Sequence, residues 1–374
     1  MKRFFTLSLV ILMVASSLLL TSCVKKPVEV TPVSLGIPTR SARFGINRSP
    51  WDMMFYEGKL YIGNGDFDDN AGPIDVWCYD PKTDKWEKSG TVRDESVSRF
   101  VLIDSKLAAT GTDPMDDWEL GNYYVLENGE WKTVRTIPGA VHNFDMVEHN
   151  GKIFCAIGVE PGGYPAAVST DGGATFTQVP FYKDGKPLDT SDDTSIRTYS
   201  TFLFKDQVYT SYVGRDPNGA YYELYRFEND RFVFQKSLSD EMGHMAITQG
   251  LYSANVEYKN KYFIATGYMF VTEDMDDFKY IKYPNADVCY DYKIIGNKLY
   301  SLTSFEVEKG KHKICVWENS SGKDNDFKQL FYFYYDAPCI SFEYENGDFY
   351  IGIGSSKAAY SQNGEILKVH HPVK

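Results

Sequence analysis

Arginine, aspartate, tyrosine and tryptophan side chains recur just before the apolar runs of this 374-residue sequence. Aromatic faces stack on sugar rings while charged groups hydrogen-bond hydroxyls, so this set suits a polar ligand such as a glycan. Asp52, Asp145 and Asp291 begin or directly precede an apolar run, which makes them the candidate acid/base carboxylates if the chain is an enzyme. The candidate ligand-binding residues are Arg48, Trp51, Asp52, Arg99, Trp118, His142, Asp145, Arg197, Tyr199, Arg215, Tyr252 and Asp291.

One short loop carries oxygen side chains at alternate positions. Asp66, Asp68 and Asn70 precede Gly72, and alternating carboxylates and amides are how short loops fold around Ca²⁺. Ala71 stands where the EF-hand pattern has glycine, and no bidentate glutamate follows at the right distance. The loop is therefore either a Ca²⁺ site or an acidic surface turn.

The elements that must position these side chains are short β-hairpins. An apolar strand, a tight turn rich in Gly, Asn, Asp and Lys, and a second apolar strand recur along the whole chain. The first residue after each turn is Lys59, Lys106, Lys152, Gln207, Lys261, Lys298 and Asp348. The mean spacing of about 48 residues is typical of propeller blades.

A second hairpin follows the first in most repeats, and a large apolar residue stands just past its turn. These residues are Trp86, Trp131, Phe176, Phe232, Phe278, Phe327 and, in the last repeat, Ile366. We expect the rings to fill the gaps between neighbouring blades. Two hairpins per repeat predict an all-β, seven-bladed β-propeller with four antiparallel strands per blade, whose entry loops gather on one face. Its last blade closes either with Ile366–Val369 as the outer strand or with Arg43–Ile46 added from the N-terminal side.

The segment Ser169–Phe176 is similar to the Asp-box, S-x-D-x-G-x-T-W/F, of sialidases and related BNR-repeat propellers. Thr272–Phe278 resembles a degenerate copy, and Tyr79–Trp86 resembles the kelch form of the same turn. In such families the Asp-box stabilises a turn, so the resemblance implies a fold superfamily and no particular activity. The F/Y-R-I-P signature of sialidases is absent, since Gly36–Pro38 and Thr136–Pro138 lack its arginine.

The N-terminus reads as a targeting segment. Lys2 and Arg3 precede an apolar stretch, and Leu20–Cys23 resembles the bacterial lipobox, in which the cysteine is lipidated. The resemblance implies a signal peptide over residues 1–22 and a lipidated Cys23. Residues 23–43, rich in proline and without aromatics, are expected to be a flexible tether, and residues 44–374 the propeller. The protein would then be anchored to the cell envelope, facing the periplasm or the exterior.

The overall charge of the chain argues against nucleic acid as a partner. The chain has 51 acidic and 39 basic residues, a net charge of −12, whereas nucleic-acid binding depends on clustered Lys and Arg. Besides Cys23 the cysteines are Cys78, Cys155, Cys289, Cys315 and Cys339. Because their number is odd and no pair has CxxC spacing, we expect buried hydrophobic residues and neither a zinc site nor a disulfide framework.

Three functions fit these observations. The first is a non-catalytic binding module for a glycan or a protein partner. The second is a carbohydrate-active enzyme, a sialidase-like glycoside hydrolase or a lyase, that uses the same propeller face. The third is a structural subunit of an envelope assembly.

Overall fold

The computed structural model describes residues 27–42, 45–66, 72–191, 196–216, 219–238, 255–266, 268–283, 289–355 and 358–373. These residues form an almost purely β structure, in which two short 3₁₀ helices, η1 (Pro38–Ser41) and η2 (Ile46–Arg48), precede the first sheet. Within the described ranges, no helix has the length and apolar character needed to cross a bilayer. Cys23 and the expected signal peptide lie outside the described residues.

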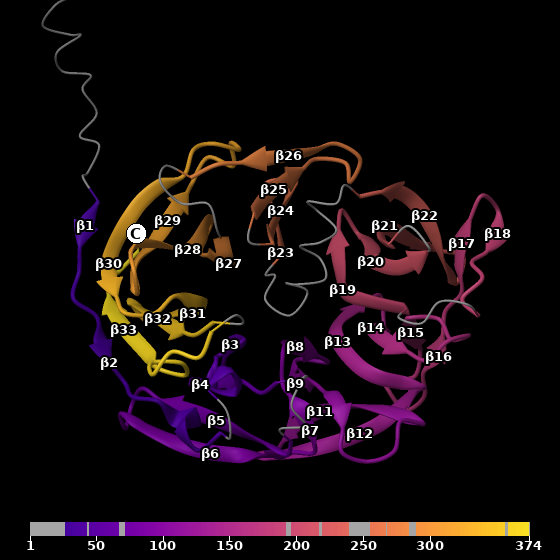
Figure 1. The fold of residues 1–374 in the computed structure, drawn as a ribbon, viewed down its shortest axis with the longest axis horizontal. Helices are drawn as coiled ribbons and strands as arrows, with labels where there is room; N and C mark the ends of the chain where they lie inside the picture. The colour runs from indigo at the N-terminus through magenta and orange to yellow at the C-terminus, as the bar shows by residue number, and fades with distance from the viewer. Residues whose placement is uncertain are drawn as a thin grey trace, which may run out of the picture.

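The strands form sheets arranged in a ring around a central opening, with the innermost strands facing the centre (Figure 1). This arrangement is that of a β-propeller. Four sheets have four strands each. The first two contain β3 (Asp52–Tyr56), β4 (Lys59–Gly63), β5 (Ile74–Asp80) and β6 (Lys85–Val92), then β8 (Phe100–Ile103), β9 (Lys106–Thr110), β11 (Leu120–Glu127) and β12 (Glu130–Pro138).

Three further sheets complete the other side of the ring (Figure 1). One has β23 (Asn255–Tyr258), β24 (Lys261–Thr266), β25 (Tyr268–Thr272) and β26 (Phe278–Ile281). A five-stranded sheet has β27 (Cys289–Ile295), β28 (Lys298–Glu308), β29 (Lys311–Asn319), β30 (Lys328–Tyr335) and β1 (Val28–Glu29). The last has β31 (Cys339–Glu345), β32 (Asp348–Ile353), β33 (Ile366–His370) and β2 (Val33–Ser34).

The remaining sheet has twelve strands and spans what the sequence divides into two repeats. Its central strands are β13 (Ala140–His149), β14 (Lys152–Val159), β15 (Ala166–Ser169), β16 (Thr177–Gln178), β19 (Ile196–Phe204), β20 (Gln207–Asp216), β21 (Gly219–Glu228) and β22 (Arg231–Ser237). Its flanking strands are β7 (Asp94–Ser96), β10 (Thr112–Pro114), β17 (Phe181–Lys183) and β18 (Lys186–Pro187).

The prediction of seven separate blades is therefore wrong. The described residues give five separate sheets of blade size, with four or five strands each, and one twelve-stranded sheet. The third and fourth repeats are continuous because Gly158 of β14 pairs with Arg197 of β19. A Cβ atom at Gly158 would lie 2.5 Å from the ring of His142, so the missing side chain allows the close approach of strand and ring.

Each predicted inner hairpin is confirmed as an antiparallel strand pair. The pairs are β3–β4, β8–β9, β13–β14, β19–β20, β23–β24, β27–β28 and β31–β32. The turn residues include positive-φ Asn, Asp and Gly, such as Gly58 and Asn150, as tight hairpins require.

Residues 28–34, expected to belong to a flexible tether, are instead paired with the last two sheets (Figure 1). β1 runs parallel to β30, and β2 runs antiparallel to β33 as the outermost strand of its sheet. Leu35 extends this contact, since its N–H donates to the carbonyl of Ile366 at 2.8 Å. Closure therefore differs from both alternatives considered above, because Ile366–His370 is the third strand and Val33–Ser34 supplies the fourth. An open edge of β33 would otherwise leave its backbone groups unpaired.

Aromatic side chains fill the spaces between sheets, as expected. Trp131 of β12 packs against Tyr61 of β4, with ring centroids 6.1 Å apart, and Phe327 packs against Phe263 of β24 at 6.1 Å. The five cysteines within the described ranges are free and buried, which confirms their role as small core residues.

The turn at Ser169–Phe176 is stabilised by its own polar side chains. Asp171 accepts hydrogen bonds from the Thr175 N–H at 2.9 Å and the Thr175 hydroxyl at 2.6 Å, while Ser169 Oγ accepts one from the Gly173 N–H at 2.8 Å. The bonds from Thr175 lower the pKa of Asp171 to about 2. Asp171 therefore stabilises the turn in which it lies.

Candidate functional site

The three candidate acid/base residues occupy one equivalent position in the inner strands of their repeats, seven residues before the first residue after the turn. In each, one carboxylate oxygen accepts a hydrogen bond from the backbone of the neighbouring inner strand. Asp52 accepts one at 2.7 Å, Asp145 at 3.2 Å and Asp291 at 3.0 Å. The donors are the N–H groups of Phe100, Thr201 and Phe342. These aspartates therefore link one inner strand to the next.

Two cations lie beside these carboxyls. Arg99 occupies the equivalent position in its own repeat, and its Nε lies 3.4 Å from Asp145 Oδ1. Lys293 Nζ lies 2.6 Å from Glu343 Oε1 and 3.9 Å from Asp291 Oδ2. Sequence reasoning missed Lys293 and Glu343, although each stands two residues further along an inner strand and so on the same face as the equivalent position.

Burial dominates the protonation of these carboxyls. It raises the pKa of Asp145 to about 6, against the opposing charge of Arg99. It raises the pKa of Asp291 to about 7, against the opposing charge of Lys293. Burial alone would lower the pKa of Lys293, but the Asp291 and Glu343 carboxylates raise it above its ordinary value. These groups are hydrogen-bonded to the backbone or ion-paired with one another. The inner strands are therefore held rigidly by polar contacts.

A second group of candidate residues gathers where β10, β13 and β19 meet. His142 Nδ1 lies 3.2 Å from Asp113 Oδ1, and the His142 ring stacks on Phe144 with centroids 5.0 Å apart. Phe144 in turn contacts Tyr199 of β19 at 4.6 Å. The ring of His142 also lies against Gly158, which pairs with Arg197. We call the residues Thr112, Asp113, His142, Asn143, Phe144, Arg197 and Tyr199 the rim site.

Polar atoms of the rim site remain without hydrogen-bond partners in the described structure. They include Thr112 Oγ1, Asp113 Oδ2 and Asn143 Oδ1, all of them buried. Asp113 also has a φ of +55°, a left-handed conformation that costs energy in most residues and clusters at functional positions. A buried acceptor without a partner loses the free energy of its hydrogen bond to water.

Within the described ranges, Arg197 lacks the ion pair that Arg93, Arg99, Arg135 and Arg226 each have. It is partly buried, and among the described residues nothing forms an ion pair or hydrogen bond with its side chain. Arg93 pairs with Asp116 at 3.1 Å, Arg226 pairs with Glu228 at 2.8 Å, and Arg135 pairs with Asp117. Arg197 therefore belongs to the same strand as Tyr199 and has no charged partner among the residues that the structure describes.

The other predicted residues lie apart from this group. Trp51 is 3% exposed and its Nε1 donates to the Gly65 carbonyl at 2.7 Å, so its ring is a core element. Trp118 is 56% exposed on the segment before β11. Arg48 lies in η2 and is partly buried, and Arg215 is exposed near the end of β20.

The proposed Ca²⁺ loop gains no support from the structure. Asp66 is buried, while Asp68, Asn70 and also Tyr252 lie outside the described residues. In the described part of the chain, no three His, Cys, Asp or Glu side chains come together in an arrangement that would hold a metal ion.

The ring of sheets defines the class of this protein as a β-propeller. No protein-family model matches the chain, and no curated protein matches it. Among solved structures, the chain is similar to the Dos1 propeller, with 13% identity, a TM-score of 0.48, and coverage of 85% of this chain and 77% of that one. It is also similar to an ulvan lyase of a polysaccharide lyase family, with 11% identity, a TM-score of 0.48, and coverage of 93% and 94%. Sqt1 of Saccharomyces cerevisiae has 9% identity, a TM-score of 0.46, and coverage of 93% and 100%. At these identities the likeness concerns the fold alone.

Proposed function

We propose that the rim site binds an anionic glycan and that Arg197 pairs with a carboxylate or sulfate of that ligand. The observation that carries this proposal is Arg197, which is partly buried and has no ion-pair partner within the described ranges, in a chain with a net charge of −12. A guanidinium removed from water is favourable only when an anion pairs with it, and its planar fork fits a carboxylate through two parallel hydrogen bonds.

The surrounding residues favour a sugar over a simple anion. Sugar hydroxyls both donate and accept, so they can pair with the Oδ2 of Asp113, whose side chain is 15% exposed. Phe144, which is 3% exposed, stacks on His142 and contacts Tyr199, so these rings hold His142 in place and little conformational entropy is lost on binding. A uronate-bearing or sulfated glycan has both an anionic group for Arg197 and hydroxyls for the other polar groups of the rim site.

Binding is tested by calorimetry with polygalacturonate, alginate and a sulfated glycan, and with a neutral glucan as reference. Because a charge-assisted hydrogen bond contributes about 1.5–3 kcal/mol, we expect Arg197→Ala to weaken binding of the anionic glycan by roughly 10-fold to 100-fold. Arg231→Ala is the matched control, since it removes the same charge from a residue that stacks on Tyr182. Equal loss in both variants, or no binding of any anionic glycan, would contradict the proposal and favour a protein partner or an assembly role.

The Asp113–His142 pair favours a second function, cleavage of the same ligand by β-elimination. Arg197 neutralises the uronate carboxylate, which acidifies the adjacent C5–H, and His142, oriented by Asp113, takes that proton. The electron pair forms a C4–C5 double bond and expels the glycosidic oxygen, which leaves with a proton from the Tyr199 hydroxyl or water. Ultraviolet absorbance of the unsaturated product, lost in His142→Ala while binding persists, would establish a lyase. Binding without product would establish a binding module.

We also propose that Cys23 carries a lipid and displays the propeller on the cell envelope. The support is the lipobox-like segment Leu20–Cys23 directly after an apolar stretch. A glycan-binding face exposed beyond the membrane would then meet extracellular or periplasmic polysaccharide.

A further inference from the structure

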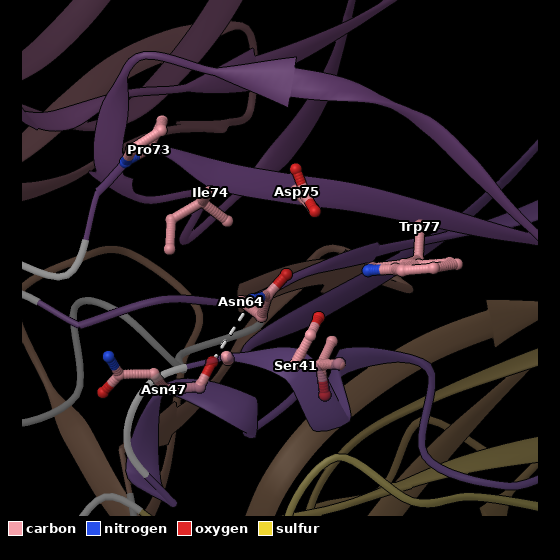
Figure 2. A pocket seen from close by; sticks show the side chains of 9 residues that line it. Ser41, Asn47, Asn64, Pro73, Ile74, Asp75 and Trp77 are labelled. Carbon is pink, nitrogen blue, oxygen red and sulfur yellow. Dashed lines mark hydrogen bonds between the residues drawn. The ribbon is translucent and has the colours of Figure 1, made fainter.

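A separate polar cavity lies between the N-terminal segment and the first sheet, away from β13 and β19 (Figure 2). Its volume is about 170 Å³. Residues of η1, η2 and β5 and the residue after β4 line it together, including Ser41, Asn47, Asn64, Ile74, Asp75 and Trp77. None of these residues belongs to the rim site.

Two asparagines make this cavity unlike a simple packing gap. Asn47 is 1% exposed and Asn64 is 3% exposed. Both amide atoms of Asn47 and the Oδ1 of Asn64 have no hydrogen-bond partner in the described structure. Only the Nδ2 of Asn64 is used, donating to the Asn47 carbonyl at 3.2 Å. Figure 2 shows the Asn47 amide directed away from Trp77 and Asp75, so the buried Asn64 Oδ1 is the unpaired group that a ligand in the cavity would complete.

The polar groups converge on one space. In Figure 2 the Asn64 amide oxygen, the Ser41 hydroxyl and the indole nitrogen of Trp77 face the interior of the cavity, with the carboxylate of Asp75 above them. Asp75 is partly neutralised, since Lys88 Nζ lies 2.6 Å from its Oδ1. The cavity therefore presents donors and acceptors together with one aromatic side chain and no unpaired charge among the described residues.

We propose that this cavity binds a single neutral sugar ring. A cavity of about 150 Å³ accepts a benzene ring, so this one admits one six-membered ring and excludes a disaccharide. A neutral hydroxyl-rich ring supplies acceptors for the Trp77 N–H and donors for Asn64 Oδ1, which an apolar ligand cannot do. The cavity is a second carbohydrate site, independent of Arg197 and of the anionic glycan proposed there.

The test is an NMR titration of the ¹⁵N-labelled protein with D-glucose, D-galactose, D-mannose, D-xylose and L-rhamnose. Trp77→Phe assigns the indole N–H signal of Trp77 among the six tryptophans. We expect at least one sugar to shift this signal in a saturable way with a dissociation constant in the millimolar range. If no sugar shifts it, the proposal is wrong.

Two variants locate the binding site. Ser41→Leu places an apolar side chain at the exposed mouth of the cavity and should abolish the shift, while its matched control Ser41→Ala should retain it. Asn64→Ala should weaken binding at least 10-fold, because it removes the buried acceptor. Arg197→Ala should leave the shift unchanged. A shift that persists in Ser41→Leu and Asn64→Ala would place the sugar elsewhere and overturn the proposal, whatever the outcome for the anionic glycan.

Discussion

At the scale of single residues, one equivalent position of the inner strand holds an aspartate in three repeats and an arginine in another. Asp52, Asp145 and Asp291 use it to accept a hydrogen bond from the next inner strand. Arg99 uses it to neutralise Asp145. The cost of burying Asp145 and Asp291 appears in their raised pKa values, so part of the stability of the ring depends on pH.

Replacing Asp291 tests this dependence. A carboxyl whose pKa is about 7 in the folded chain and near its ordinary value of about 3.9 when unfolded holds its proton more tightly in the fold. Its contribution to the free energy of unfolding is therefore fully present below about pH 4 and is lost as pH rises towards 7. Between pH 5 and pH 8 the native chain should lose on the order of 2 kcal/mol more stability than Asp291→Asn, measured by denaturant unfolding.

The control for this experiment is Asp276→Asn, since the Asp276 side chain is 82% exposed. It should lose as much stability as the native chain over the same pH range. Equal pH dependence in native chain and Asp291→Asn would show that the Asp291 proton is not coupled to folding.

The candidate site could be predicted from sequence only in part. Asp52 begins β3, as the sequence predicted, whereas Asp145 and Asp291 lie further inside β13 and β27. Repeat register could not separate Trp51, whose indole bonds to a backbone carbonyl, from an exposed residue such as Trp118, because residue type and spacing do not specify side-chain direction. The cavity lined by Asn47 and Asn64 could not be predicted from the sequence, since single asparagines beside turns are common in any sequence.

At the scale of elements, local patterns and long-range pairings differ in how far the sequence predicts them. Alternating apolar residues and turn chemistry were sufficient for every inner hairpin. The joining of β14 to β19 was not predictable, since it depends on the approach allowed at Gly158. Val33–Ser34 has no strand pattern of its own, and its partner β33 offers mainly backbone groups.

Removing the N-terminal strands tests their part in closure. A chain that begins at residue 45 lacks β1 and β2, so the edges of β30 and β33 become unpaired. It also loses the hydrogen bond at 2.7 Å from Trp86 Nε1 to the Leu35 carbonyl. With about 0.5–1.5 kcal/mol per hydrogen bond, we expect its thermal midpoint to fall by about 5 °C or more relative to a chain that begins at residue 27. If calorimetry gives the same thermal midpoint for both chains, β1 and β2 do not contribute to the stability of the ring.

At the scale of the whole molecule, the proposed anchor and the ring meet within a few residues. Cys23 precedes Val28, the first residue of β1, by five positions, which span at most about 18 Å when fully extended. A lipid on Cys23 would therefore hold the edge of the five-stranded sheet close to the membrane surface.

The anchor is tested by Cys23→Ser. Because acyl chains contribute about 0.8 kcal/mol per buried methylene, we expect the native protein in the membrane fraction and the variant in the soluble fraction. Circular dichroism should be the same for both, since Cys23 lies outside the sheets. A variant that remains with the membranes would rule out a lipid on Cys23 as the anchor.

The pairing of β2 with β33 also determines when the protein can finish folding. Ser34 and Glu365, which are in contact, are 331 residues apart in the chain, and the ribosome makes β2 long before its partner exists. Contacts between such distant residues form late and slowly, because the loop between them must first be ordered. Only a chain synthesised through Lys368 contains both residues of β33 that pair with β2. The ring can therefore close only after β33 has been synthesised. A chain that ends earlier keeps the open edge of an unpaired strand, which proteases and chaperones recognise.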